Sequence, residues 1–133
     1  MESKQKTARW QVLEILEEVF EEGAYSNIAL NRALNQSLLS QADKGLVTEL
    51  VYGTVARKIT LEWYLSHLIE DRDKLDNWLY ILLMLSLYQM LYLDKIPQHA
   101  VVHEAVEIAK IRKRGSEKFV NALLRRIERE GVA

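Results

Sequence analysis

Basic residues gather toward the end of this 133-residue chain. Residues 105–133 carry eight Lys or Arg against four Asp or Glu, whereas residues 1–53 carry five against eight. Lys and Arg side chains neutralise phosphates and release counterions, which is the chemistry that binding a nucleic-acid backbone requires. We therefore predict phosphate contacts from one group of cations near each end of the chain: Lys4, Lys6 and Arg9, and Arg112, Lys113, Arg114, Lys118, Arg125, Arg126 and Arg129.

The same cations also have an ordinary structural explanation. Residues 112–114 can form a solvated turn whose positive charges are stabilised by the negative, C-terminal end of a helix dipole. The later arginines can form a charged helix face. The net charge of −1 adds no support, because it gives no general attraction for nucleic acid. Trp10, beside Arg9, is the best placed aromatic residue for stacking on an unpaired base, and filling the core is an equally good role for it.

The residues do not favour catalysis by this chain alone. It has no cysteine, which excludes a thiolate nucleophile, a disulfide and a thiolate metal site. His99 and His103 are four residues apart, with Glu107 one turn further, but the second histidine of the H-E-x-x-H zinc motif is missing. Surface or capping histidines at a helix start are the favoured interpretation, so no metal is expected.

The elements that position these residues are predicted to be helices. Residues with high helix propensity dominate, and the chain has only five Gly and one Pro. No stretch reads as a strand, so we predict an all-α fold of about seven helices. Cap-forming residues place helix starts at Thr7, Ser26, Ser40 (with Asp43 three residues on), Thr60, Pro97 and Ser116, and helix ends at Gly23 and Gly115.

Apolar residues at helical spacing indicate which faces are buried. We expect Leu38 to point inward with the second helix, and Phe119 to join Val120 and Leu123 on the apolar face of the last helix. From Asn77 to Leu93 no charged residue occurs. Ser86, Gln89 and three tyrosines interrupt this run, so a helix buried in the middle of a bundle is favoured over a membrane span.

The N-terminus has no apolar segment of the kind that a signal peptide carries. Together with the absence of cysteine, this favours the reducing cytoplasm as the compartment. Neither a membrane nor DNA is expected as a partner. The chain is long enough for one domain with a substantial core, which we place at residues 1–133.

Several motifs, in this order along the chain, resemble a known family. They read E-E-G-A-Y-S-N-x-A-L from Glu21, T-E-L-V-Y-G-T from Thr48, D-K-I-P from Asp94, P-x-H-A-V-V-x-E-A-V-E-I-A-K from Pro97, and F-V-N-A-L-L-R-R from Phe119. This series resembles the NusB-like RNA-binding domain at the front of the Sun/RsmB family of ribosomal RNA cytosine-C5 methyltransferases. Free NusB antitermination factors more often read F-V-N-G-V-L-D at the last motif.

The resemblance implies a NusB-like bundle of two helical subbundles that helps such a bacterial methyltransferase engage small-subunit ribosomal RNA. Cytosine C5 methylation needs a thiolate, so the reaction is expected in a separate catalytic domain of a longer chain, which would also bind S-adenosylmethionine. This domain itself is expected to hold no cofactor.

Two other functions remain open from the sequence. The domain could be a protein-interaction module, whose partner is a ribosomal protein or its own C-terminal catalytic domain. A loop-rich polar surface at residues 53–58 could be the dock for such a partner. Alternatively, it could be a free transcription antitermination factor, which the N-A-L-L-R-R motif disfavours.

Overall fold

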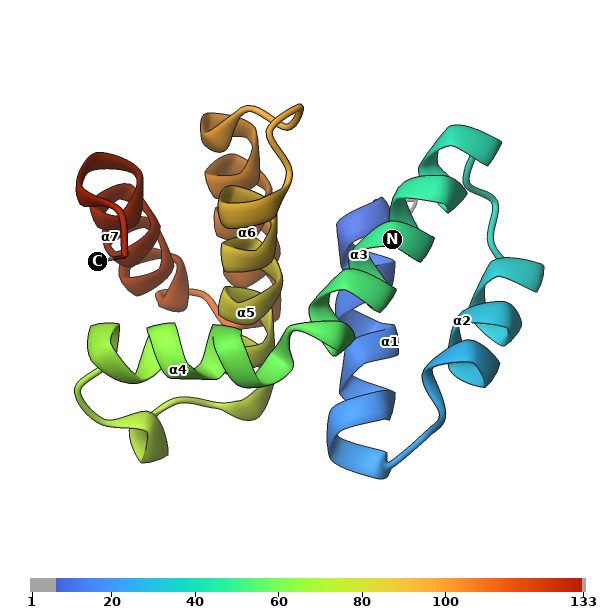
Figure 1. The fold of residues 1–133 in the computed structure, drawn as a ribbon, viewed down its shortest axis with the longest axis horizontal. Helices are drawn as coiled ribbons and strands as arrows, with labels where there is room; N and C mark the ends of the chain where they lie inside the picture. Colours follow the sequence, from blue (N-terminus) through green and yellow to red (C-terminus); the bar gives the residue numbers. More distant parts are fainter. Residues whose placement is uncertain (1–6, 133) are drawn as a thin grey trace. The chain divides into compact units, whose positions relative to one another are not determined.

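The computed structural model describes residues 7–132, which form seven α-helices and one 3₁₀ turn and contain no β-strand (Figure 1). The chain divides into two compact units, one ending at Ala56 and the other beginning at Arg57. This confirms the predicted all-α class and the two helical subbundles. Lys4 and Lys6 lie outside the described residues.

The N-terminal unit contains α1 (Ala8–Glu22), α2 (Ser26–Asn35) and α3 (Gln41–Ala56), and each helix packs against the other two. The Thr7 side chain accepts a hydrogen bond from the Trp10 N–H at 3.1 Å, which fixes the start of α1. Gly23 ends α1 with a φ of 76°, the left-handed conformation that glycine adopts without strain. The Ser40 hydroxyl likewise accepts the Asp43 N–H at 3.1 Å at the start of α3.

Two predictions for the N-terminal unit were wrong. Ser26 is the first residue of α2 rather than its N-cap, because the backbone of Tyr25 occupies that position and no side chain caps the helix. Leu38 is 85% exposed, because α2 ends at Asn35 and its periodicity does not continue into the following connection. The buried apolar residues of α2 are instead Ala29 and Leu30.

The C-terminal unit contains α4 (Lys58–Leu68), a 3₁₀ turn (Arg72–Lys74), α5 (Asn77–Tyr92), α6 (Gln98–Arg112) and α7 (Ser116–Glu130). α5 is its central element, because it packs against α4, α6 and α7. α6 and α7 form a closely packed pair joined by the basic turn at residues 113–115 (Figure 1).

The burial of α5 confirms the prediction for the uncharged segment. All ten residues from Ile81 to Met90 are buried. Buried Ser86 and Gln89 are satisfied within the helix, because the Ser86 hydroxyl donates to the Leu82 carbonyl at 2.8 Å and the Gln89 amide donates to the Leu85 carbonyl at 3.1 Å. None of the helices in the described part of the chain has the length and apolar character that crossing a bilayer requires.

Four predictions for residues 53–116 need correction. α4 begins at Lys58, and the Leu61 N–H bonds to the Arg57 carbonyl at 2.9 Å, so Thr60 lies inside the first turn. Residues 53–58 are therefore almost entirely helical, and the prediction of a loop-rich surface there was wrong. Pro97 is the residue before α6 rather than its first residue, and Gly115 rather than Ser116 occupies the N-cap position of α7.

Candidate functional site

The basic turn between α6 and α7 depends on one glycine. Gly115 has a φ of 104°, which L side chains rarely adopt. A Cβ atom built there would meet no atom within 4 Å, so the backbone conformation, and not lack of space, requires glycine. The turn holds Lys113 and Arg114 between the end of α6 and the start of α7.

Gly115→Ala is therefore expected to destabilise the protein by about 1 kcal/mol, because alanine strains a left-handed backbone. Urea unfolding followed by circular dichroism measures this difference. Gly45→Ala is the matched control, because Gly45 lies inside α3 and also has open space around its Cα. Alanine at Gly45 should be neutral or stabilising, and equal effects at the two glycines would contradict the explanation.

The basic turn is attached to the start of α5. The Lys113 ammonium lies 3.1 Å from an Asp76 carboxylate oxygen, and the Arg112 guanidinium carbon lies 5.5 Å from the centre of the Trp78 ring. Both partners of the ion pair are well exposed, so it contributes at most about 1 kcal/mol and mainly orients the turn. Arg114 is exposed, and no acidic group among residues 7–132 forms an ion pair with it.

Glu117 is the acidic residue closest to the turn in the chain. Its carboxylate accepts the Gly115 N–H at 2.6 Å. The pKa of this carboxyl is lowered below its usual 4.5, chiefly by hydrogen bonds from the backbone N–H groups of Glu117 itself and of Gly115. The ionised Glu117 carboxylate thus stabilises the N-terminus of α7.

A carboxyl group whose pKa is lower in the folded state than in the unfolded state stabilises the fold at pH values above its unfolded-state pKa. This stabilisation is lost as the pH falls through the folded-state pKa. For Glu117 the loss begins near its usual value of 4.5 and continues below it. We expect the original protein to lose more stability on acidification through this range than Glu117→Gln does. Urea unfolding at a series of pH values measures the difference, and parallel pH curves would contradict it.

Lys118 and Phe119 extend the basic turn into the first turn of α7. Both are exposed, and 40% of Phe119 remains accessible, so the prediction that its ring joins the core was wrong. The buried residues of α7 are Val120, Leu123, Leu124 and Ile127, and Phe119 lies at the edge of that stripe. An exposed aromatic ring beside several cations is a surface on which an unpaired base can stack. Its position directly after Lys118 was the sequence signal for this role.

The three remaining predicted cations lie at the other end of α7 and are paired there. Arg125 contacts Glu128 at 3.2 Å, Arg126 contacts Glu130 at 3.5 Å, and Arg129 contacts Glu130 at 3.7 Å. Arg125 follows Lys118 by seven residues, roughly 10 Å along α7. The cations after residue 110 therefore form two groups, which we name the turn group (Arg112, Lys113, Arg114 and Lys118) and the helix-end group (Arg125, Arg126 and Arg129).

Arg9 and Trp10 are both half-buried in the first turn of α1. They belong to the N-terminal unit, whereas the turn and helix-end groups belong to the C-terminal unit. Among the described residues no cluster of His, Cys, Asp or Glu is arranged to hold a metal ion.

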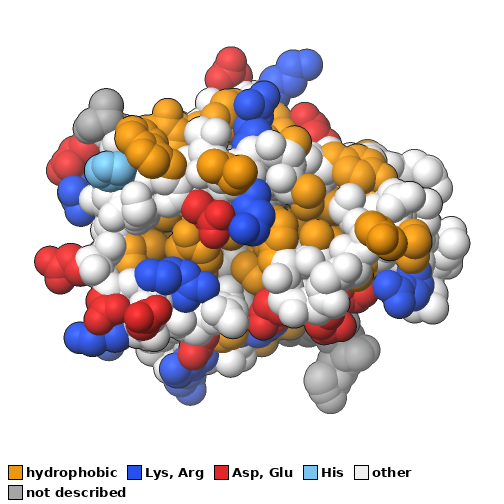
Figure 2. Space-filling view, turned by 60° about the horizontal axis from the view of Figure 1, so that its bottom comes forward, with side chains coloured by type: hydrophobic (Ala, Val, Ile, Leu, Met, Phe, Trp, Pro, Cys, Tyr) orange, Lys and Arg blue, Asp and Glu red, His pale blue; other side chains and the backbone are white. Residues whose placement is uncertain are grey.

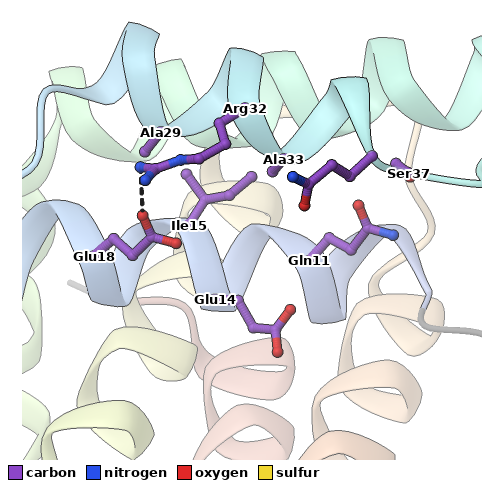
Figure 3. A pocket seen from close by; sticks show the side chains of 9 residues that line it. Gln11, Glu14, Ile15, Glu18, Ala29, Arg32, Ala33 and Ser37 are labelled. Carbon is purple, nitrogen blue, oxygen red and sulfur yellow. Dashed lines mark hydrogen bonds and ion pairs between the residues drawn. The ribbon is translucent and has the colours of Figure 1, made fainter.

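The N-terminal unit also has an open groove of about 320 Å³ between α1 and α2 (Figure 3). Glu18 on α1 and Arg32 on α2 point toward one another across it and pair at 2.9 Å, while Gln11 and Ser37 lie toward its other end. Because this groove contains an ion pair and neutral amides, it attracts phosphate less strongly than the turn group does.

The chain belongs to the NusB family, whose sequence model matches residues 6–129. It is 48% identical over 130 residues to the probable ribosomal RNA small subunit methyltransferase B of Bacillus subtilis, an alignment that covers 97% of this chain but 29% of that protein. It is 32% identical to the transcription antitermination protein NusB of Bacillus velezensis, with 94% of this chain and 95% of that protein covered. The chain thus spans less than a third of the methyltransferase and nearly all of the antitermination protein.

The structure is similar to that of Thermotoga maritima NusB, with a TM-score of 0.84 over 100% of this chain and 96% of the other. The two sequences are 24% identical, so this similarity concerns the fold. The predicted family and fold are both confirmed.

Proposed function

We propose that this chain is the RNA-binding accessory domain of a small-subunit ribosomal RNA cytosine-C5 methyltransferase. The observation that carries the proposal is the higher identity to a methyltransferase B, 48%, than to a free NusB protein of full matching length, 32%. The N-A-L-L-R-R motif from Asn121 to Arg126 supports the same choice. On this proposal the cysteine thiolate and S-adenosylmethionine belong to a catalytic domain elsewhere in the enzyme, because this sequence contains no cysteine.

We assign the main RNA contact to the turn group together with Phe119. Arg114 and Lys118 are exposed cations that can approach phosphates, and the exposed ring of Phe119 offers a face for a base. The helix-end group and the N-terminal cations Lys4, Lys6 and Arg9 remain proposed as secondary phosphate contacts. The arginines of the helix-end group would exchange weak surface ion pairs for phosphates, at a cost of about 0–1 kcal/mol each.

In this role the domain would work on ribosomal RNA in the bacterial cytoplasm, with neither DNA nor a membrane as a partner. The direct test is a titration of labelled single-stranded RNA from the small subunit, followed by fluorescence anisotropy at several salt concentrations. Binding should weaken steeply with salt, and a double-stranded DNA of equal length should compete poorly. Absence of salt-dependent RNA binding would contradict the RNA part of the proposal.

The gene tests the methyltransferase part separately. A reading frame that continues after Ala133 into a Gly-rich cofactor fold containing cysteines would support it. A frame that stops there would favour a free antitermination factor.

Phe119→Ala is expected to weaken RNA binding about fivefold to a hundredfold, which corresponds to a stacking contribution of roughly 1–3 kcal/mol per base. Phe119→Leu is the matched control, because it keeps apolar bulk and removes the aromatic face. The same anisotropy titration measures both variants. If the leucine variant binds like the original protein, apolar contact and not stacking is the role of Phe119.

A further inference from the structure

The C-terminal unit has a second open groove, between α4 and the end of α7, with a volume of about 440 Å³. Its floor is aromatic: the Trp63 ring lies 5.2 Å from the Tyr64 ring and 4.5 Å from the His67 ring, measured between centroids. Trp63 is nevertheless 60% exposed. The residues lining the groove are Trp63, Tyr64, His67, Leu68, Arg126, Glu130, Gly131 and Val132.

The His67 ring of the floor is held against the backbone of α4. His67 Nδ1 lies 2.9 Å from the Trp63 carbonyl oxygen, and the Ser66 hydroxyl donates to the same oxygen at 2.6 Å. Ile59 is 83% exposed and lies one helical turn before Trp63, so an apolar stripe continues along α4 beyond the groove. Figure 2, which looks toward the side of the molecule that carries α4, shows hydrophobic side chains exposed among charged ones. A preformed apolar surface of this kind favours binding, because little ordering is required.

Charge decides between the possible occupants. Arg126 in the groove wall pairs with Glu130 at 3.5 Å, and Arg129 lies 3.7 Å from the same carboxylate group. A phosphate that approached Arg126 would therefore also approach the negative charge of Glu130. Among the residues that line the groove, Arg126 and Glu130 are one cation and one anion, so the groove attracts a nucleic-acid backbone less than the turn group does. An apolar polypeptide segment meets no such penalty, because interface cores are depleted of charged residues.

We propose that this groove docks an apolar segment of the methyltransferase's own remaining polypeptide. This inference rests on the proposed function. More than two-thirds of the Bacillus subtilis methyltransferase lies outside the part that this chain matches. Gly131 and Val132, which follow α7, line the groove, so a polypeptide that continues from α7 begins inside it. Covalent linkage gives such a segment a high effective concentration, so a modest contact suffices to keep it docked.

The test labels the three tryptophans with 5-fluorotryptophan and observes them by fluorine NMR, with the Trp63 resonance assigned by its loss in Trp63→Phe. A soluble paramagnetic chelate should broaden the Trp63 resonance in the 133-residue chain. In the complete gene product, this broadening should be lost. Equal broadening in both proteins would overturn the proposal, as would a gene product that ends at Ala133.

Two further outcomes would assign the groove to another occupant and overturn the proposal. One is protection of Trp63 when RNA is added to the 133-residue chain, and the other is protection that grows with the concentration of that chain alone. In the complete gene product, Trp63→Ala should make the polypeptide after residue 133 more accessible to limited proteolysis. Ile111→Ala is the control, because Ile111 is 61% exposed but does not line the groove.

RNA affinity separates this inference from the proposed function. Trp63→Ala should leave the affinity of the 133-residue chain for RNA nearly unchanged, because the turn group lies outside the groove and the substitution keeps Arg126, the secondary phosphate contact that lines it. Loss of docking with normal RNA binding, and loss of RNA binding with normal docking, are therefore distinguishable results.

Discussion

A triple variant in which glutamate replaces Arg112, Lys113 and Arg114 should bind RNA roughly tenfold more weakly or worse. The slope of log K against log salt concentration should become shallower by about two. The slope estimate follows because each phosphate contact on a single strand contributes about 0.7. The structure supports a large effect, because these side chains sit on a turn that the Lys113–Asp76 pair and the Arg112–Trp78 contact hold in place. Anisotropy titrations at four or five salt concentrations measure both quantities.

The helix-end group supplies a matched comparison. Replacing Arg125, Arg126 and Arg129 with glutamate changes the net charge by the same amount, but all three arginines pair with Glu128 or Glu130, whereas Arg114 of the turn group pairs with no acidic group among residues 7–132. We expect a smaller loss of affinity from this second triple variant. Circular dichroism should show both variants folded. An equal or larger effect from the helix-end variant would move the main RNA contact away from the turn.

Leu83→Ala should produce the largest loss of stability among these variants, about 2–5 kcal/mol. Leu83 is fully buried in the centre of α5, which packs against three other helices. Alanine there removes apolar contact and leaves a cavity that neighbours on several sides cannot all close. For a chain of this length the melting temperature should fall by roughly 10 °C.

Thermal and urea unfolding measure the effect of Leu83→Ala, and Leu38→Ala is the control. Leu38 is 85% exposed, so the same chemical change there should alter stability by less than about 0.5 kcal/mol. If the two leucines gave similar losses, α5 would not be the centre of the C-terminal unit.

The sequence predicted those parts of the fold in which local chemistry decides the outcome. The Thr7 and Ser40 caps, the turn at Gly23 and the uncharged helix α5 follow from side chains acting on their own backbone or from long apolar runs. Ser26, Thr60 and Ser116 were misplaced for a shared reason. A polar residue near a helix start signals the start, but the backbone carbonyl that accepts the first helical hydrogen bond fixes the N-cap position.

The candidate sites depended more on tertiary packing. Composition alone located the basic stretch, but only the structure separates the turn group from the paired helix-end group. Phe119 fits a helical apolar pattern, yet 40% of it is exposed in the folded chain. Trp63 and Ile59 carry a signal that the sequence does contain. They are four residues apart and fall outside the buried positions Leu61 and Leu65 of α4.

The position of α5 in the chain affects how the protein is made. During translation this uncharged helix leaves the ribosome before α6 and α7, the helices that cover it. Ile127 is the last buried residue of α7. Until it has emerged, part of the apolar surface of α5 is not covered by α7 and is open to aggregation or chaperone binding. The C-terminal unit therefore completes its folding only after Ile127 has emerged, and ribosome pausing between residues 93 and 127 would increase the demand for chaperones.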